Sequence, residues 1–294
     1  MSGQFFNNNN PRILMCPPQY FGIEYSINDW MNTTILSQYD LAQSQWNSLY
    51  SKIIELGAKV ELVEPIAGQP DMTYVDVGLV YSNIFITSNF KFPERQGEKK
   101  GFVKWFEVNR FNIFEFENTI SFEGHGDTLW KDGHTLFGGY GFRTQLESYD
   151  YIQKILDQKA EQNFTKNSEQ DSEKNILTKP KIITLELIDS RFYHLDTCFC
   201  PIRSDLALCY TKALSLESIE KIRSVMEIVE VDEDEAVHFA CNALPIGNNL
   251  ILPEGAPKLM SKLEELGFVC HPVPMSEFIK GGGACKCLSM PLQV

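Results

Sequence analysis

Residues 55–60 read Glu-Leu-Gly-Ala-Lys-Val, and residues 265–270 read Glu-Leu-Gly-Phe-Val-Cys. In each copy, apolar residues at helical spacing precede the glycine, and an extended apolar stretch follows it. Gly57 and Gly267 therefore predict helix ends, because glycine readily adopts the backbone conformation that closes a helix. These near-copies predict the same helix-then-strand unit in two distant parts of the chain.

Three looser copies of this unit lie between those two. The predicted pairs of helix and strand are 46–56 with 60–62, 104–109 with 111–116, 149–159 with 182–188, 219–226 with 228–231, and 259–266 with 268–273. Units this short cannot each bury a core, so they must pack together. The pattern predicts an α/β fold of five repeating units. An open α/β sheet whose units are alike by chance is the alternative.

Composition limits the classes of protein that remain. The chain has 294 residues, with 26 basic and 39 acidic side chains and a net charge of −13. This acidity argues against nonspecific nucleic-acid binding, which needs a basic surface. No apolar run reaches the roughly 18 residues of a membrane span, and no signal peptide is visible at residues 1–11, which we expect to form a disordered tip. We expect one cytoplasmic catalytic domain over residues 12–294, with a polar surface insertion at 160–178.

The cysteines also bear on the compartment and on metals. There are eight: Cys16, Cys198, Cys200, Cys209, Cys241, Cys270, Cys285 and Cys287. In a long chain without an export signal, free thiols are the better interpretation than a disulfide framework. The two close pairs have one-residue spacing, whereas zinc knuckles use two to four residues. We therefore predict no metal site, and no glycine-rich turn after the first strand indicates a nucleotide site.

Chemically capable side chains follow four of the predicted strands. They are Asp71 and Asp76, Glu123 and Asp127, His194 and Asp196, and Cys285 and Cys287. If the repeats surround an axis, these groups converge and supply a nucleophile, a general acid/base and anchors for a cation. Each alone has a structural explanation, such as a turn aspartate or a buried core histidine. Cys287, after three glycines, is the better candidate nucleophile, and Cys285 is its competitor.

Four motifs in order make the chain similar to a known family. They are Phe-Glu-Gly-x-Gly-Asp at 122–127, Gly-Tyr-Gly-Phe-Arg at 139–143, His-Leu-Asp-Thr at 194–197 and Gly-Gly-Ala-x-Lys-Cys-Leu-Ser at 282–289. With these the chain resembles the guanidine-modifying enzymes: arginine deiminases, dimethylarginine hydrolases and amidinotransferases. Bacterial arginine dihydrolases are the nearest branch, and the resemblance covers residues 12–292.

The resemblance implies a fold and a set of roles. The fold is a five-bladed α/β propeller (pentein) with pseudo-fivefold symmetry, which agrees with the five units. Cys287 would be the nucleophile, because Cys-x-Ser fits the family pattern at 287–289. His194 would be the general acid/base and Asp196 would grip the guanidinium. The remaining roles are orientation of the histidine by Glu123, shared by Asp127, and anchoring of the substrate α-carboxylate by Arg95 and Arg143.

One motif departs from the dihydrolase branch. Where that branch reads Phe-Thr-Ala-Asn-Ala-Gly, residues 74–78 read Tyr-Val-Asp-Val-Gly. The family's asparagine is associated with continuing to ornithine, whereas an aspartate binds the guanidinium in relatives that stop at citrulline. Asp76 therefore favours citrulline, against the overall resemblance.

The resemblance thus implies a cysteine-dependent hydrolase of a small guanidino substrate, foremost L-arginine, that releases ammonia with citrulline or ornithine. A covalent thiouronium would be the intermediate, with no metal or organic cofactor required. The alternatives are an amidinotransferase, a hydrolase of methylated arginine and a binding protein without turnover. The sequence is compatible with a homo-oligomer and does not define one.

Overall fold

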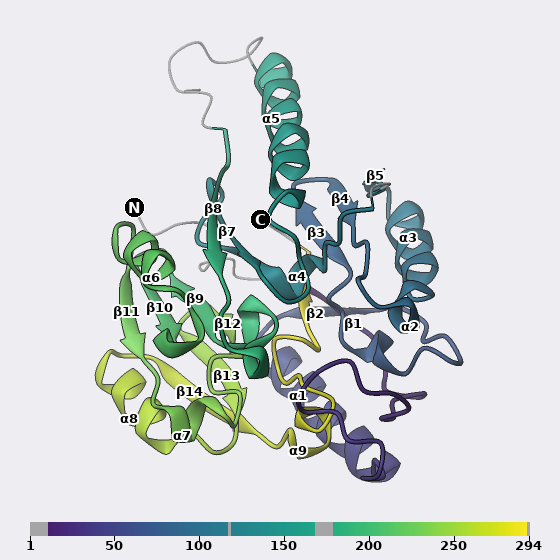
Figure 1. Ribbon diagram of the computed structural model, residues 1–294, viewed down its shortest axis with the longest axis vertical. Helices are drawn as coiled ribbons and strands as arrows, with labels where there is room; N and C mark the ends of the chain where they lie inside the picture. The colour runs from purple at the N-terminus through teal and green to yellow at the C-terminus, as the bar shows by residue number, and fades with distance from the viewer. Residues whose placement is uncertain (1–10, 117–118, 168–178, 293–294) are drawn as a thin grey trace.

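The computed structural model describes residues 11–116, 119–167 and 179–292. Its strands form five separate three-stranded sheets (Figure 1). They are β15 (Met290–Pro291), β1 (Arg12–Met15) and β2 (Lys59–Leu62); β3 (Gly78–Tyr81), β4 (Ile84–Thr87) and β5 (Asn112–Phe114); β6 (Thr128–Trp130), β7 (Thr135–Tyr140) and β8 (Lys181–Glu186); β9 (Phe199–Arg203), β10 (Leu206–Cys209) and β11 (Glu227–Glu230); and β12 (Leu244–Ile246), β13 (Asn249–Pro253) and β14 (Val269–Val273). The predicted α/β class is confirmed.

All five sheets have the same connectivity. The central strand pairs antiparallel with one neighbour and parallel with the other. A helix makes each parallel crossover, as parallel strands require. These helices are α1 (Tyr39–Glu55), α3 (Lys99–Val108), α5 (Ser148–Asn167), α6 (Leu216–Arg223) and α8 (Pro257–Glu265). The five helix-then-strand units expected from the sequence are therefore present.

The first sheet is completed from the far end of the described chain. Strand β15 pairs with β1 through Ile13 with Pro291 and Leu14 with Met290. The sequence analysis did not predict this strand, because two residues are too few to show an alternating pattern. The pairing places residues from opposite ends of the described sequence next to each other in one sheet.

The hydrophobic core lies between these sheets and their helices. On α1 the apolar stripe of Trp46, Leu49 and Ile53 is fully buried and packs in one cluster with strands β1 and β13. Helix α3 lies on one flank of the molecule and α6 and α8 on the opposite flank (Figure 1). Each crossover helix thus covers sheet surface that would otherwise face water.

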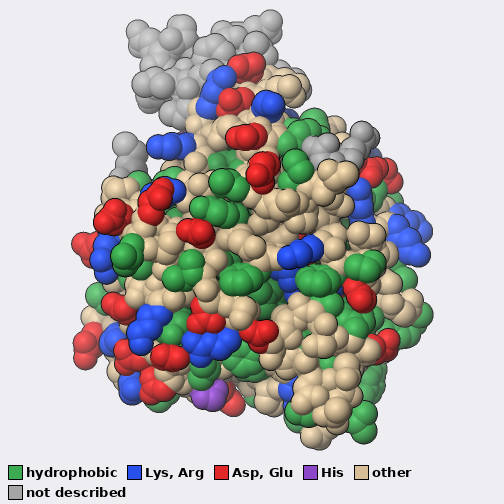
Figure 2. Space-filling view, viewed as in Figure 1, with side chains coloured by type: hydrophobic (Ala, Val, Ile, Leu, Met, Phe, Trp, Pro, Cys, Tyr) green, Lys and Arg blue, Asp and Glu red, His purple; other side chains and the backbone are tan. Residues whose placement is uncertain are grey.

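Helix α5 continues into the polar stretch predicted as an insertion. Residues 160–167 extend the helix, which projects from the body of the molecule in Figure 1. Residues 168–178 of that stretch, and residues 1–10 of the predicted tip, lie outside the described residues. On the face shown in Figure 2, acidic and basic side chains are interspersed. No helix within the described ranges is long and apolar enough to span a bilayer.

The helix ends explain why only two copies of the repeat are obvious in the sequence. Gly57 and Gly267 follow α1 and α8 with φ of 89° and 88°. The equivalent residue after α3 is Arg110, which takes φ of 63° despite its side chain. A left-handed conformation costs a non-glycine residue about 1–2 kcal/mol. The second of the five units therefore keeps the same helix ending without the glycine that identifies it.

These positions give a matched pair of stability predictions. We expect Gly267→Ala to lower the free energy of unfolding by about 1–2 kcal/mol. The loss would come from backbone strain and not from a steric clash, because an added Cβ meets no atom within 4 Å. Arg110→Gly removes the same strain and should leave the protein at least as stable. Urea unfolding of both variants measures this. Loss of stability in Arg110→Gly, or no loss in Gly267→Ala, would contradict the backbone strain that we assign to these helix ends.

Candidate active site

Polar side chains converge from the five connections that lead from one sheet to the next. They are Asp71 and Asp76 between β2 and β3, Glu123 and Asp127 between β5 and β6, His194 and Asp196 between β8 and β9, Asn242 between β11 and β12, and Cys287 between β14 and β15. All are buried. The sequence analysis found four of these connections and missed the fourth in chain order, which supplies Asn242.

Cys287 lies at the centre of a buried anionic cluster. Its Sγ donates to Oδ2 of Asp196 at 3.2 Å. The Sγ of Cys287 and one carboxylate oxygen each of Asp196 and Asp76 all lie within 4.8 Å of one another. Burial, followed by the charges of Asp196 and Asp76, raises the pKa of the Cys287 thiol well above its usual range. Burial and these two carboxylates thus favour the protonated thiol.

The competing thiol does not line this site. Cys285 is fully buried, and burial raises its pKa as well. The pocket is lined by Cys287 and by Gly281, Gly282 and Gly283, and not by Cys285. A Cβ on Gly283 would lie 2.6 Å from the Tyr74 ring. The glycines thus allow the backbone to pass close to that ring and present Cys287 to the pocket.

His194 is held by a chain of charged groups. Its Nε2 lies 2.9 Å from Oε2 of Glu123, which also accepts from Nη1 of Arg143 at 2.7 Å. Burial opposes ionisation of Glu123, but the charges of Arg143 and His194 hold its pKa well below the usual range. Gly126 permits the ring to approach, because a Cβ there would lie 2.6 Å from Nδ1 of His194.

Glu123 and Asp127 have different positions relative to this histidine. Glu123 touches the imidazole, whereas Oδ1 of Asp127 accepts from the backbone N–H of Leu195 at 3.0 Å. Burial alone would lower the pKa of His194, but the charges of Asp127 and Glu123 outweigh it and raise that pKa. Both acids therefore favour the protonated ring, and only Glu123 orients it directly.

Two carboxylate oxygens face this cluster without a partner. Among the described residues, Oδ1 of Asp76 and Oδ1 of Asp196 are buried and accept no hydrogen bond. Nδ1 of His194 lies 3.9 Å from the other oxygen of Asp76. Burial raises the pKa of both aspartates, and Asp196 adds to the rise at Asp76. Unpaired buried oxygens are costly, so this cluster favours a cation that can donate several hydrogen bonds.

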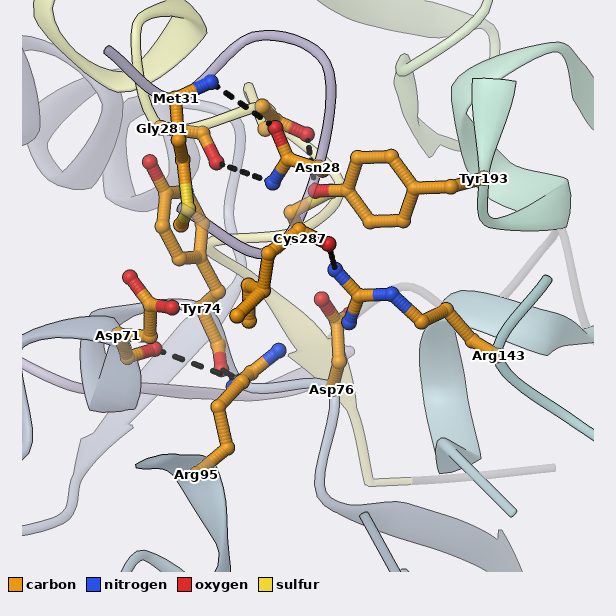
Figure 3. Close-up of a pocket in the computed structure, with 13 residues that line it drawn as sticks. Asn28, Met31, Asp71, Tyr74, Asp76, Arg95, Arg143, Tyr193, Gly281 and Cys287 are labelled. Carbon is orange, nitrogen blue, oxygen red and sulfur yellow. Dashed lines mark hydrogen bonds between the residues drawn. The ribbon is translucent and has the colours of Figure 1, made fainter. Parts of the chain in front are cut away.

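Two arginines enter the same pocket. Figure 3 shows Arg95 and Arg143 pointing from different sides toward the space around Asp76. Arg95 binds Glu98 through two hydrogen bonds of 2.8 and 3.0 Å. Arg143 donates Nη2 to the carbonyl of Ile27 at 2.9 Å. Each guanidinium is thus fixed by a protein acceptor while it borders the pocket.

A further acid shares the arginine end of the pocket. Asp71 lines the pocket and accepts from the Tyr25 hydroxyl at 3.0 Å, while its Oδ1 has no partner among the described residues. Burial raises the pKa of Asp71, and Arg95 opposes the rise. The pocket therefore offers positive and negative groups together at its arginine end, and it brings Asp76 close to Cys287.

Asn242 hydrogen-bonds to the connection that carries Cys287 and to the connection that carries Asp196, and the sequence analysis missed it. Its Nδ2 donates to Sγ of Cys287 at 3.1 Å and to the carbonyl of Asp196 at 3.0 Å. Its Oδ1 accepts from the backbone N–H groups of Lys286 and Cys287 at 2.9 and 3.2 Å. The signal that could have found it is its position after the strand predicted at 228–231, where the other units carry functional groups.

We expect Asn242→Ala to lower the free energy of unfolding by about 2–3 kcal/mol, because it leaves buried donors without an acceptor. Asn249→Ala is the matched control, since its half-buried amide lies on β13 away from the site. It should cost about 1 kcal/mol or less. Denaturant unfolding compares the two, and an equal loss in both variants would contradict the role of Asn242.

Comparison with known proteins gives close relatives. No family model matches the chain. It is 40% identical over 285 residues to the bifunctional arginine dihydrolase/ornithine cyclodeaminase ArgZ of Synechocystis, covering 95% of this chain and 37% of that protein. The chain thus spans little more than a third of ArgZ. It is 32% identical over 283 residues to the N(G),N(G)-dimethylarginine dimethylaminohydrolase of Mycobacterium tuberculosis, covering 96% and 85% of the two chains.

Solved structures agree with these relatives. The N-terminal domain of ArgZ, covalently bound to a reaction intermediate, superposes with a TM-score of 0.86 at 39% identity, covering 96% of this chain and 97% of that one. The protein is thus an α/β protein of the same architecture as that domain. It belongs to the guanidine-modifying superfamily of arginine dihydrolases and dimethylarginine hydrolases, which its sequence motifs predicted.

Proposed function

We propose that the protein is a cysteine-dependent hydrolase of the guanidino group of L-arginine. The observation that carries this proposal is the pair of open carboxylate oxygens, on Asp76 and Asp196, beside Sγ of Cys287. A guanidinium is planar and cationic and presents several N–H donors, so charge-assisted hydrogen bonds can satisfy both oxygens at once. Its central carbon would then lie next to the thiol.

The proposed fold is a five-bladed α/β propeller with pseudo-fivefold symmetry, formed as a single domain by residues 12–294. The identical connectivity of the five sheets supports it, as does the convergence of all five inter-sheet connections. Eight free cysteines support the proposed cytoplasmic location, since thiols persist in reducing compartments.

The other end of the pocket supports an α-amino acid. Arg95 and Arg143 would bind the substrate α-carboxylate, and the open oxygen of Asp71 would accept from the α-ammonium. A decarboxylated guanidine such as agmatine would leave both arginines without their partner. Free arginine therefore fits the pocket better than agmatine does.

Catalysis would begin when the substrate cation lowers the pKa of Cys287. The thiol proton passes to Asp196, which it already faces, and the thiolate attacks the guanidinium carbon. His194, protonated through its neighbouring acids, donates a proton to the departing nitrogen, and ammonia leaves a covalent thiouronium. His194 then removes a proton from water as the water oxygen attacks the same carbon. The C–S bond breaks with its electron pair on sulfur, the hydroxyl loses its proton to solvent as the carbonyl of citrulline forms, and Asp196 returns its proton to the thiolate.

Asp76 favours citrulline as the product. The ureido group of citrulline is neutral and carries a carbonyl oxygen that needs a donor. An ionised carboxylate at Asp76 only accepts, so it offers nothing to that oxygen. A second hydrolysis to ornithine would require the ureido group to bind where two carboxylates favour a cation. We therefore propose that the reaction stops at citrulline.

A methylated arginine is the second candidate substrate. The dimethylarginine hydrolase of M. tuberculosis aligns over 85% of its own length, whereas ArgZ aligns over 37%. Hydrolysis of a dimethylated guanidinium gives the same citrulline but releases dimethylamine instead of ammonia. The released amine therefore distinguishes the two substrates.

We expect incubation with L-arginine to give citrulline and one ammonia, measured by chromatography with dimethylarginine in a parallel reaction. Cys287→Ser should slow turnover at least about 10³-fold, because it removes the nucleophile. Cys285→Ser is the matched control and should keep most of the rate. No citrulline from either substrate would contradict the proposal, and amidino transfer to an added amine would favour the amidinotransferase alternative.

Asp76→Asn tests the basis of product choice. The amide keeps the shape and gains a donor for the ureido oxygen, while it removes one charge that holds the cation. We expect the ornithine-to-citrulline ratio to rise, with a higher KM for arginine. The products are quantified against the unchanged protein at equal conversion. Ornithine as the main product of the unchanged protein would contradict the role assigned to Asp76.

A further inference from the structure

Lys286 is a buried lysine that none of the roles above uses. It lies between the two cysteines of the last connection and is 6% exposed, although lysine is rarely buried without a partner. Its Nζ contacts Nε2 of His125, which belongs to the short helix α4 (Gly124–Asp127). The contact joins the connection that carries Cys287 to the connection that carries Glu123.

The surroundings of His125 keep its ring neutral. Burial, and then the charge of Lys286, hold the pKa of His125 well below its usual range. A hydrogen bond with the backbone of Ser289 occupies the ring on another side. A neutral imidazole has one donating and one accepting nitrogen. His125 can therefore accept from the Lys286 ammonium and fix where that charge lies.

The ammonium acts on the negative groups of the site. Burial lowers the pKa of Lys286, and the groups that oppose this are Asp196, Cys200, Asp76 and Cys287. Conversely, Lys286 counters the effect of burial on Asp196 and on the Cys200 thiol. The Sγ of Cys287 and one carboxylate oxygen each of Asp76 and Asp196 lie within 4.8 Å of one another. When these groups ionise, like charges this close repel strongly where water is excluded, so their ionisation depends on a cation nearby.

We propose that Lys286, held by His125, is a positioning residue whose ammonium prepares Cys287 and its neighbouring carboxylates for ionisation before the substrate cation arrives. The assignment rests on the proposed function, since it concerns the same thiol. Lys286 does not touch the reacting atoms in this scheme. The positive charge of its ammonium favours the thiolate form of Cys287 electrostatically, and the substrate guanidinium adds a second positive charge when it binds.

The decisive measurement is the alkylation of Cys287 by iodoacetamide in the substrate-free protein. The rate is followed from pH 6 to about pH 11.5, because the pKa of this thiol is raised well above its usual range, and mass spectrometry scores the peptide that contains Cys287. In Lys286→Met, which keeps the stem and removes the charge, we expect the pH midpoint to rise by about one unit or more. Below the midpoint the rate would fall about tenfold, and it would recover at high pH, because only the thiolate reacts.

Three further variants separate charge from packing. Lys286→Arg should keep the midpoint close to that of the unchanged protein. His125→Gln keeps an acceptor and should also stay close, whereas His125→Phe keeps a ring without an acceptor and should shift upward. If Lys286→Met does not fold, the two His125 variants decide the question. A Lys286→Met profile that coincides with the unchanged one, or that falls equally at every pH, overturns the proposal, as does an unshifted His125→Phe.

The alkylation profile uses no substrate, so it is independent of the proposed reaction. If the protein makes no citrulline from arginine or dimethylarginine, the proposed function fails, and the profile still decides whether Lys286 sets the ionisation of Cys287. If citrulline forms but the profile does not shift, only the role of Lys286 fails.

Discussion

The structure depends on one electrostatic constraint: a thiol and two carboxylates are buried close together, and each carboxylate keeps an open hydrogen-bond acceptor. Asp76 and Asp196 each keep an oxygen without a hydrogen-bond partner among the described residues. Burying such groups costs several kcal/mol unless they find a partner. The surrounding fold must supply that energy from its core. A site held in this condition favours a donating cation, because such a ligand would remove a penalty that folding created.

The fold holds this cluster by distributing it over separate units. No single connection carries more than part of the charge, and each begins and ends on a strand of a packed sheet. Each group is therefore held between strands of two different sheets. Fixed partners complete the arrangement: Glu123 between His194 and Arg143, and Asn242 between Cys287 and Asp196. Preorganisation of this kind means that little reorganisation remains when the substrate binds.

The sequence predicted much of this because the repeat carries local signals. Glycine after a helix and alternating apolar residues are properties of short segments, so all five crossover units could be located. Asn242 escaped because an amide has no charge or reactive atom to mark it, and its importance arises only from four contacts made in the folded state. His125 also escaped, because its contact with Lys286 spans 161 positions. Long-range pairings of this kind have no local pattern.

Strand β15 has a consequence for how the molecule assembles. It begins three residues after Cys287 and closes the first sheet against β1. The segment that places Cys287, the proposed nucleophile, is therefore also the segment that joins the last described residues to the first sheet. A fragment lacking these residues would lose a sheet edge and the thiol at the same time. Loss of the β15 pairing would therefore disturb the first sheet and the position of Cys287 together.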